Sequence, residues 1–181
     1  MKLYELITFT VRVRTVATAM ACLEQRLAVD DAAVKLVGCW ASEIGPLNQI
    51  AVLRGFVDEA SRQAERERYL SSADVFGIEA YLTDMRVESY TLFPFIQPLS
   101  AGCHGPFYEL RVYDLMPSGL APTLKGWEKA VGPRTDVQYS PVYAAFYATD
   151  GQLPRYLHIW PYASLEQRLD VRARAVQDGV W

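Results

Sequence analysis

The sequence lacks the residues and the long apolar runs that mark several large classes of protein. Its 181 residues include three cysteines without CxxC spacing and only two histidines. This count argues against a disulfide framework and a metal centre, so no metal ligand and no cofactor is predicted. No run approaches the roughly 20 apolar residues of a membrane span, and the N-terminus alternates instead of forming an apolar signal segment. We therefore expect a cytoplasmic protein that does not enter a membrane.

Charge of one sign is not in excess either. Eighteen Lys and Arg stand against 21 Asp and Glu, which gives a formal net charge of −3. Such a chain has no general attraction to nucleic-acid phosphates, so nucleic-acid binding is not predicted. The glycine-rich loops of nucleotide-binding proteins and the GxSxG motif of hydrolases are absent. The composition, 51% hydrophobic and 22% charged, is typical of a globular protein with a buried core.

The same order of elements occurs twice along the chain. One alternating segment opens at Tyr4-Glu5-Leu6 and a second at Tyr108-Glu109-Leu110. Hydrophobic periodicity and turn residues predict a helix, two strands and another helix after each. In the first copy these are residues 15–28, 35–42, 49–56 and 58–70, and in the second 120–131, 140–149, 155–164 and 165–176. Asp150-Gly151 predicts a hairpin turn, Ser164 an N-cap, and Gly132-Pro133 the end of a helix.

A short helical piece near residues 72–82 and a strand at 85–93 complete a β-α-β-β-α-β unit in the first half, which is the ferredoxin-like arrangement. The second half stops at residues 179–181, before its last strand. A ferredoxin-like sheet carries both helices on one face, so its other face needs a cover. The predicted fold is α+β, with tandem ferredoxin-like (βαββαβ) units whose antiparallel sheets pack face to face as a pseudo-dimeric α/β barrel.

The predicted domains are residues 1–92 and 107–181, joined by a linker at 93–106 that is rich in Pro and Gly. Because the second unit is short, its sheet has an edge that a second copy of the chain could complete, which makes a homodimer one expected partnership.

Two motifs that occur in order resemble the NIPSNAP domain family. They are YELRVYDL and the later LHIWPYASLEQR, with YELI and VLRGFVDEASRQAER as a weaker version in the first half. The resemblance implies the dimeric α/β-barrel superfamily of ferredoxin-like folds. Related barrels include cofactor-independent monooxygenases, small isomerases and dehydratases, and sensors. The resemblance supplies no catalytic residues.

The strand RYLHIWPYAS, residues 155–164, suggests where a site could lie. Alternation places Leu157 and Ile159 on one face and, on the other, Tyr156, His158, Trp160 and Tyr162. We expect the aliphatic pair to pack on the helices, so that the aromatic face points between the two sheets. The same alternation sends further side chains into that space: Glu109, Arg111, Tyr113 and Tyr143 from the second sheet, Glu5 and Arg54 from the first.

Apolar and aromatic walls with a few polar groups are typical of a small-molecule site. The predicted ligand has an apolar body and a polar or anionic head. His158 would transfer a proton, since imidazole titrates nearest neutral pH, while Arg111 would hold an anionic or enolate oxygen and Glu109 would orient one of them. The predicted ligand-binding side chains are Tyr113, Tyr143, Tyr156, Trp160, Tyr162 and Arg54.

Two classes of function stay open from the sequence. One is a protein that binds such a ligand, as an oxygenase or isomerase-type enzyme or without turnover. The alternative is a noncatalytic protein-interaction module with a filled barrel, in which Glu109 and Arg111 form a structural pair. Cys103-His104 is expected in a turn of the linker. A solvated helix face with local ion pairs is expected for Arg62, Arg66, Arg68, Arg168, Arg172 and Arg174.

Overall fold

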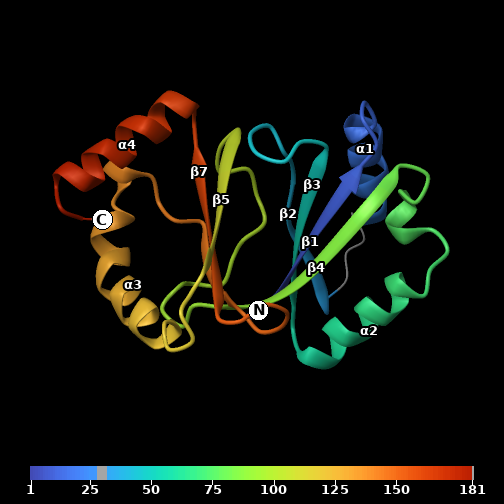
Figure 1. The fold of residues 1–181 in the computed structure, drawn as a ribbon, viewed down its shortest axis with the longest axis horizontal. Coiled ribbons are helices and arrows are strands. Elements are labelled where there is room, and N and C mark those ends of the chain that lie inside the picture. The colour runs from blue at the N-terminus through green and yellow to red at the C-terminus, as the bar shows by residue number, and fades with distance from the viewer. Residues whose placement is uncertain (28–31, 181) are drawn as a thin grey trace. The chain divides into compact units, whose positions relative to one another are not determined.

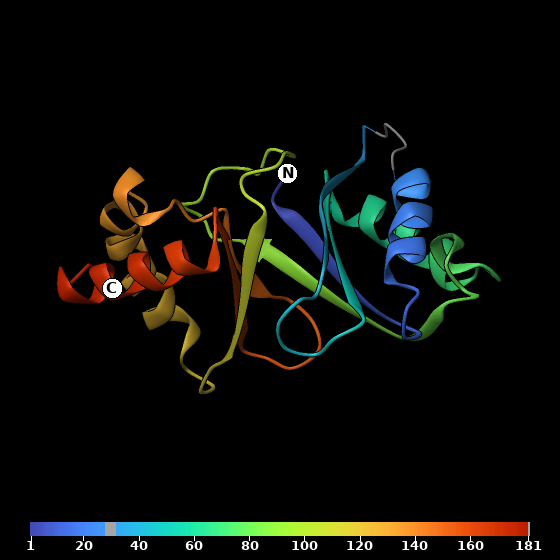
Figure 2. The same ribbon diagram turned by 90° about the horizontal axis from the view of Figure 1, so that it is seen from above.

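The computed structural model describes residues 1–27 and 32–180 and divides into two compact units, Met1–Tyr90 and Thr91–Trp181. Unit 1 and unit 2 each consist of an antiparallel sheet with two long helices on one face (Figures 1 and 2). Within residues 1–27 and 32–180, no helix has both the length and the apolar character needed to cross a membrane.

Unit 1 is a β-α-β-β-α-β unit with the strand order β2-β3-β1-β4. Its main elements are β1 (Leu3–Val11), α1 (Val16–Leu27), β2 (Val34–Ala41), β3 (Gln49–Phe56), α2 (Glu59–Leu70) and β4 (Leu82–Leu92), with a 3₁₀ turn at Val75–Gly77. Asp58 caps α2 by accepting a hydrogen bond from the Ser61 N–H at 2.8 Å. The core joins Ile7, Phe9, Ile50 and Val52 of the sheet to Ala19, Leu23 and Tyr69 of the helices.

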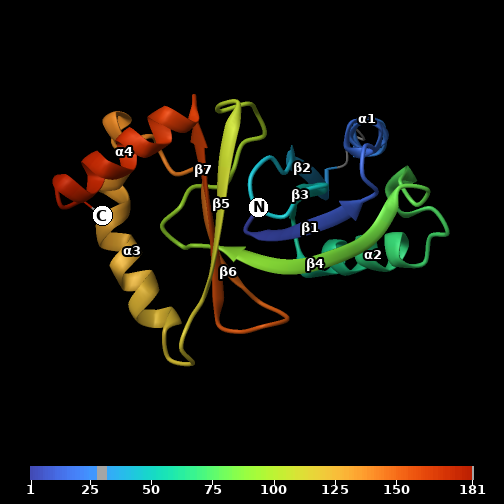
Figure 3. The same ribbon diagram turned by 45° about the horizontal axis from the view of Figure 1, so that its top comes forward.

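Unit 2 repeats the order up to its second helix (Figure 3). Its main elements are β5 (Phe107–Asp114), α3 (Leu120–Arg134), a 3₁₀ turn (Val137–Tyr139), β6 (Ala144–Ala148), β7 (Arg155–Tyr162) and α4 (Leu165–Gln177). The strand order is β6-β7-β5, and in residues 91–180 no further strand follows β5 in that order. Gly151 takes φ +71° between β6 and β7, which confirms the hairpin at Asp150-Gly151. The N-cap is confirmed too, since Ser164 accepts from the Gln167 N–H.

Two predicted helix boundaries are wrong. Residues 72–82 hold only the 3₁₀ turn at Val75–Gly77, and α3 continues through Pro133 to Arg134. A proline so near the C-terminal end removes one hydrogen bond, and the packing of the last turn outweighs this cost because the Arg134 guanidinium lies 4.2 Å from the ring centroid of Trp160. Ala28, the end of the predicted helix 15–28, and Trp181 lie outside the described residues.

The predicted direction of the strand faces is also wrong. Trp127 of α3 lies against Tyr156, His158 and Trp160, with ring centroids 6.5, 5.0 and 6.1 Å away. The aromatic face of β7 therefore packs on the helices, and Leu157 and Ile159 are buried on the opposite face. The prediction sorted the faces by polarity alone, whereas α2 and α4 bring arginines to the sheet and make the helix face the one that accepts charged side chains. The same reversal holds for Glu5 and Arg54 in unit 1.

Cys103 and Cys39 differ in exposure, which predicts a difference in their reactivity. Cys103 is exposed, whereas burial raises the pKa of Cys39 to about 11, and its Sγ lies 3.6 Å from Met20 Sδ. At pH 8 only about one in a thousand Cys39 side chains would be thiolate, the form that reacts. We expect iodoacetamide to modify Cys103 at least ~100-fold faster than Cys39, as followed by peptide mass spectrometry. Equal rates in the folded protein would contradict the burial of Cys39.

Candidate functional site

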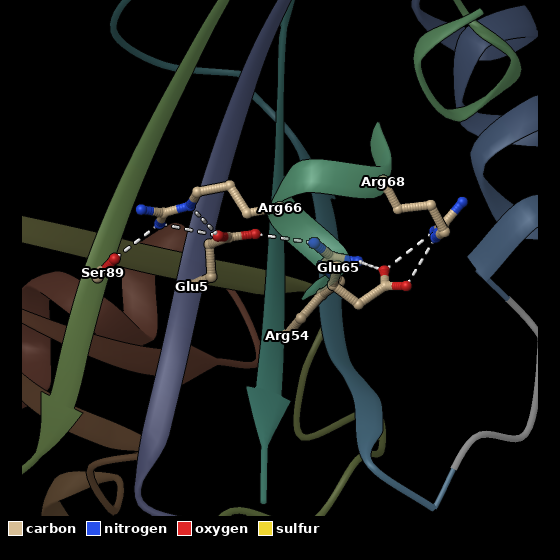
Figure 4. Close-up of polar contacts among 6 residues, drawn as sticks. All are labelled: Glu5, Arg54, Glu65, Arg66, Arg68 and Ser89. Carbon is tan, nitrogen blue, oxygen red and sulfur yellow. Dashed lines mark hydrogen bonds and ion pairs between the residues drawn. The ribbon is translucent and has the colours of Figure 1, made fainter. Parts of the chain in front are cut away.

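A polar network joins the sheet of unit 1 to α2 (Figure 4). Arg54 donates to Glu5 at 2.8 Å and to Glu65 at 2.7 Å. Arg66 donates to the other oxygen of Glu5 through Nε at 3.0 Å and Nη2 at 2.9 Å, and to the Ser89 hydroxyl at 2.7 Å. The Glu5 carboxylate is thus bonded on both oxygens by arginines from β3 and α2.

This network is closed to solvent at its centre. Glu5 is 0% and Arg54 1% exposed. The Arg54 guanidinium also lies 5.0 to 5.4 Å from the ring centroids of Phe56, Tyr69 and Phe76. Such a side chain has no surface left for a ligand, so the geometry favours a structural role for Arg54 over the predicted ligand-binding one.

The corresponding network in unit 2 has one carboxylate and three arginines. Glu109 accepts hydrogen bonds from Arg111 of the same strand and from Arg168 of α4, and Arg172 Nη1 lies 3.5 Å from its Oε1. Burial acts to raise the pKa of Glu109, but the bonds from Arg168 and Arg111 outweigh it, and the pKa falls below its usual range. Glu109 is therefore ionised at neutral pH. The helix arginines Arg66 and Arg168 therefore donate to carboxylates of the sheet, Glu5 and Glu109, and the prediction that they form a solvated helix face is wrong.

An aromatic cage surrounds His158. The ring centroids of Trp127, Tyr113 and Tyr156 lie 5.0, 5.4 and 5.6 Å from the imidazole, and the Trp160 indole N–H donates to His158 Nδ1. Burial, followed by the nearby charge of Arg111, lowers the pKa of His158 to about 3. A fully buried imidazole that stays neutral from pH 4 upward is poorly suited to proton transfer near pH 7. This geometry argues for a structural role.

A cavity in unit 2 lies away from His158, beside the segment that was predicted to be a linker. It is a solvent-open cleft of about 770 Å³. Apolar atoms come from Phe95, Ile96, Pro98, Leu99, Val131 and Val142, and polar groups from His104, Thr135, Ser140, Tyr143, Tyr162 and Gln167. Two of the predicted ligand-binding residues, Tyr143 and Tyr162, therefore meet at one cleft.

His104 is the functional candidate that the sequence interpretation missed. Its exposed imidazole lies against Tyr143, with ring centroids 4.7 Å apart, and the Tyr143 hydroxyl donates to the Ser100 carbonyl at 3.0 Å. His104 lies in an irregular segment, where no periodicity predicts which way a side chain points. The available signal was that His104 is one of only two histidines in the sequence. Burial raises the pKa of Tyr162, whose hydroxyl stays protonated and lies below the surface of the cleft.

The structure separates the predicted site residues into three groups. Arg54 belongs to the unit 1 network, and Tyr143 and Tyr162 line the cleft. The helix face of unit 2 holds Glu109, Arg111, Tyr113, Tyr156, His158 and Trp160. In the part of the chain that the structure describes, no three His, Cys, Asp or Glu side chains gather closely enough to hold a metal ion.

Comparisons of sequence place the chain near known proteins. The NIPSNAP family model matches residues 4–95 and 108–181. The Protein NipSnap homolog of Dictyostelium discoideum is 24% identical over 99% of this chain and 78% of its own length. Protein NipSnap of Drosophila melanogaster is 24% identical over 91% of this chain, which spans 60% of that relative. The match in two regions confirms a tandem repeat.

Comparisons of structure address the fold alone. A proposed monooxygenase from Fusobacterium nucleatum matches 98% of this chain and 85% of its own, with a TM-score of 0.66 and 11% identity. An anthrone oxidase-like protein matches 98% of this chain and 79% of its own, with a TM-score of 0.62 and 13% identity. The likeness over nearly the full length confirms the predicted α+β fold class.

Proposed function

The chain belongs to the NIPSNAP family, and we propose that its second unit binds a small organic molecule with an apolar body and a polar head in the cleft beside Tyr143 and Tyr162. The observation that carries this proposal is the cleft itself. Its volume of about 770 Å³ is within the range of roughly 300–1,000 Å³ that small-molecule sites occupy.

The chemistry of the walls supports the stated ligand class. Phe95, Ile96 and Val142 supply an apolar surface, on which an aromatic or aliphatic body would lie. The exposed His104 imidazole supplies a group that can donate a hydrogen bond to a head group. Few polar groups in an apolar wall orient a ligand without a large desolvation cost.

The proposed function is binding, without a claim of turnover. The proton-transfer role predicted for His158, with Arg111 and Glu109 as its partners, stays a prediction, and burial of the imidazole argues against it. A cleft lined by tyrosines, serine, threonine and one exposed histidine is suited to binding a small molecule through hydrogen bonds. The homodimer and the cytoplasmic location also stay predictions.

The cleft offers a matched pair of glycines for a test. Gly132 lines the cleft and Gly126 does not, both lie in α3, and a Cβ built at either meets no atom within 4 Å. The probe is N-phenyl-1-naphthylamine, which is neutral and apolar and gains fluorescence on burial. We expect Gly132→Phe to weaken its binding at least ~10-fold, equivalent to roughly 1.4 kcal/mol of lost apolar contact, and Gly126→Phe to leave it unchanged.

Native mass spectrometry of the purified protein, followed by denaturation, would identify a bound molecule and its head group. Equal probe affinities for Gly132→Phe and Gly126→Phe would contradict the site. Absence of both probe binding and any released molecule would favour the noncatalytic protein-interaction module.

A further inference from the structure

We propose that Arg111, Arg168 and Arg172 form a binding site for an oxyanion, a phosphate or carboxylate group, at the helix face of unit 2. This inference is independent of the cleft and of the ligand proposed for it. It rests on the charge balance of the network, on donor groups that this network does not use, and on a comparison between the two units.

The charge balance favours an anion. A single carboxylate, that of Glu109, pairs with three guanidinium groups. In unit 1 the equivalent network has two carboxylates for three arginines: Glu5 pairs with Arg54 and Arg66, and Glu65 pairs with Arg54 and Arg68. The unit 2 network therefore carries two positive charges beyond what Glu109 neutralises, in a partly buried place where screening by salt is weak.

Donor groups remain for a ligand to use. The Arg111 side chain is 9% exposed, and its Nε is buried without a hydrogen-bond partner. Each guanidinium has five N–H donors in a planar fork that fits carboxylate and phosphate oxygens. Arg172 is loosely held, at 3.5 Å from Glu109 with its side chain 45% exposed, and Arg168 is 26% exposed. An anion could therefore enter from the α4 side.

The two units differ in the oxygen atoms that a neighbouring strand offers to the helix arginines. In unit 1, strand β4 lies beside β1 and the Ser89 hydroxyl accepts from Arg66. In unit 2, β5 ends the strand order within residues 91–180, so no neighbouring strand supplies a corresponding oxygen to Arg168 or Arg172. Glu109 is accordingly 18% exposed in its side chain, whereas that of Glu5 is 0%. An external oxyanion would supply the oxygen that Ser89 supplies in unit 1.

The test uses inorganic phosphate and, in a second arm, acetate, titrated by calorimetry at pH 7.5 with ionic strength held constant by sodium chloride. The variant is Arg172→Gln, since an exposed side chain can be changed without unfolding the protein. Its control is Arg174→Gln on the same helix, where the guanidinium donates to the Gln138 carbonyl at 3.3 Å and does not contact Glu109. We expect Arg172→Gln to weaken binding at least ~10-fold, as the loss of a charge-assisted hydrogen bond predicts, and Arg174→Gln to change it less than ~2-fold.

The two titrations distinguish a phosphate site from a carboxylate site. A phosphate site would bind phosphate more tightly than acetate, whereas a carboxylate site would bind acetate as well. Equal weakening by Arg172→Gln and Arg174→Gln would overturn the proposal. So would a wild-type protein that takes up neither anion in preference to chloride. The neutral probe of the cleft reports on the other site, so failure of one proposal is distinguishable from failure of the other.

Discussion

Replacing His158 with Asn is expected to remove a large part of the loss of stability that acid causes. An unfolded histidine titrates near pH 6.5, whereas the pKa of His158 in the fold is about 3. Because the folded value is the lower one, the unfolded state binds the proton first as the pH falls. The contribution of neutral His158 is therefore complete above about pH 6.5 and is lost progressively down to about pH 3. The slope is about 1.4 kcal/mol per pH unit, or about 2–3 kcal/mol between pH 6 and pH 4.

The measurement is urea unfolding at pH 7, 6, 5 and 4 for the wild type and His158→Asn. The Asn side-chain oxygen can accept the Trp160 indole N–H in place of Nδ1, so the aromatic cage keeps its hydrogen bond. Carboxylates titrate in the same range, but they cancel in the difference between the two proteins. His104→Asn, at the exposed histidine, is the control. If both variants had the same pH dependence, His158 would not be held neutral by the fold.

The arrangement of elements could be predicted from the sequence because its signals are local. Alternation in YELRVYDL, the turn at Asp150-Gly151 and the cap at Ser164 each act within a few residues. The chain repeats these signals in order, so the repeat and the fold class follow from them. The continuation of α3 past Pro133 was missed because the packing of Arg134 on Trp160 joins residues far apart in sequence.

The direction of the strand faces could not be predicted from alternation, which defines two faces but not which one meets the helices. A usable signal was present in the repeat. Glu5 and Glu109 lie near the start of the matched strands β1 and β5, and Arg66 and Arg172 lie at matched positions of α2 and α4, the second helix of each unit. A carboxylate on a strand and an arginine on a helix that occur at matched positions in both halves indicate an ion pair between strand and helix, and therefore a carboxylate that faces the helices. The cleft gave no such signal, since one of its walls is the irregular segment from Phe95 to Pro106.

Replacing Glu5 with Gln is expected to destabilise unit 1 by about 3–5 kcal/mol, because Arg66 loses its carboxylate and the buried Arg54 keeps only Glu65 as an ion-pair partner in a site that water does not reach. The matched change in unit 2, Glu109→Gln, is expected to cost about 1–2 kcal/mol, since Arg168 and Arg172 are partly exposed and can turn toward solvent. Urea unfolding at pH 7 gives the two free energies. Hydrogen exchange assigns each loss to its own strands, β1 and β3 or β5 and β7. A larger loss for Glu109→Gln would contradict the difference in burial.

A double variant separates the worth of the buried pair from the cost of breaking it. In Glu5→Met with Arg54→Met, both buried charges are gone, and the groups left behind are Arg66 and Glu65, whose side chains are 21% and 18% exposed and can reach water or Arg68. We therefore expect the double variant to be at least ~2 kcal/mol more stable than Glu5→Met alone. A double variant less stable than either single one would mean that Glu5 and Arg54 act on the fold independently. In that case the network of Figure 4 would owe its stability to its contacts with α2 and not to the pair between β1 and β3.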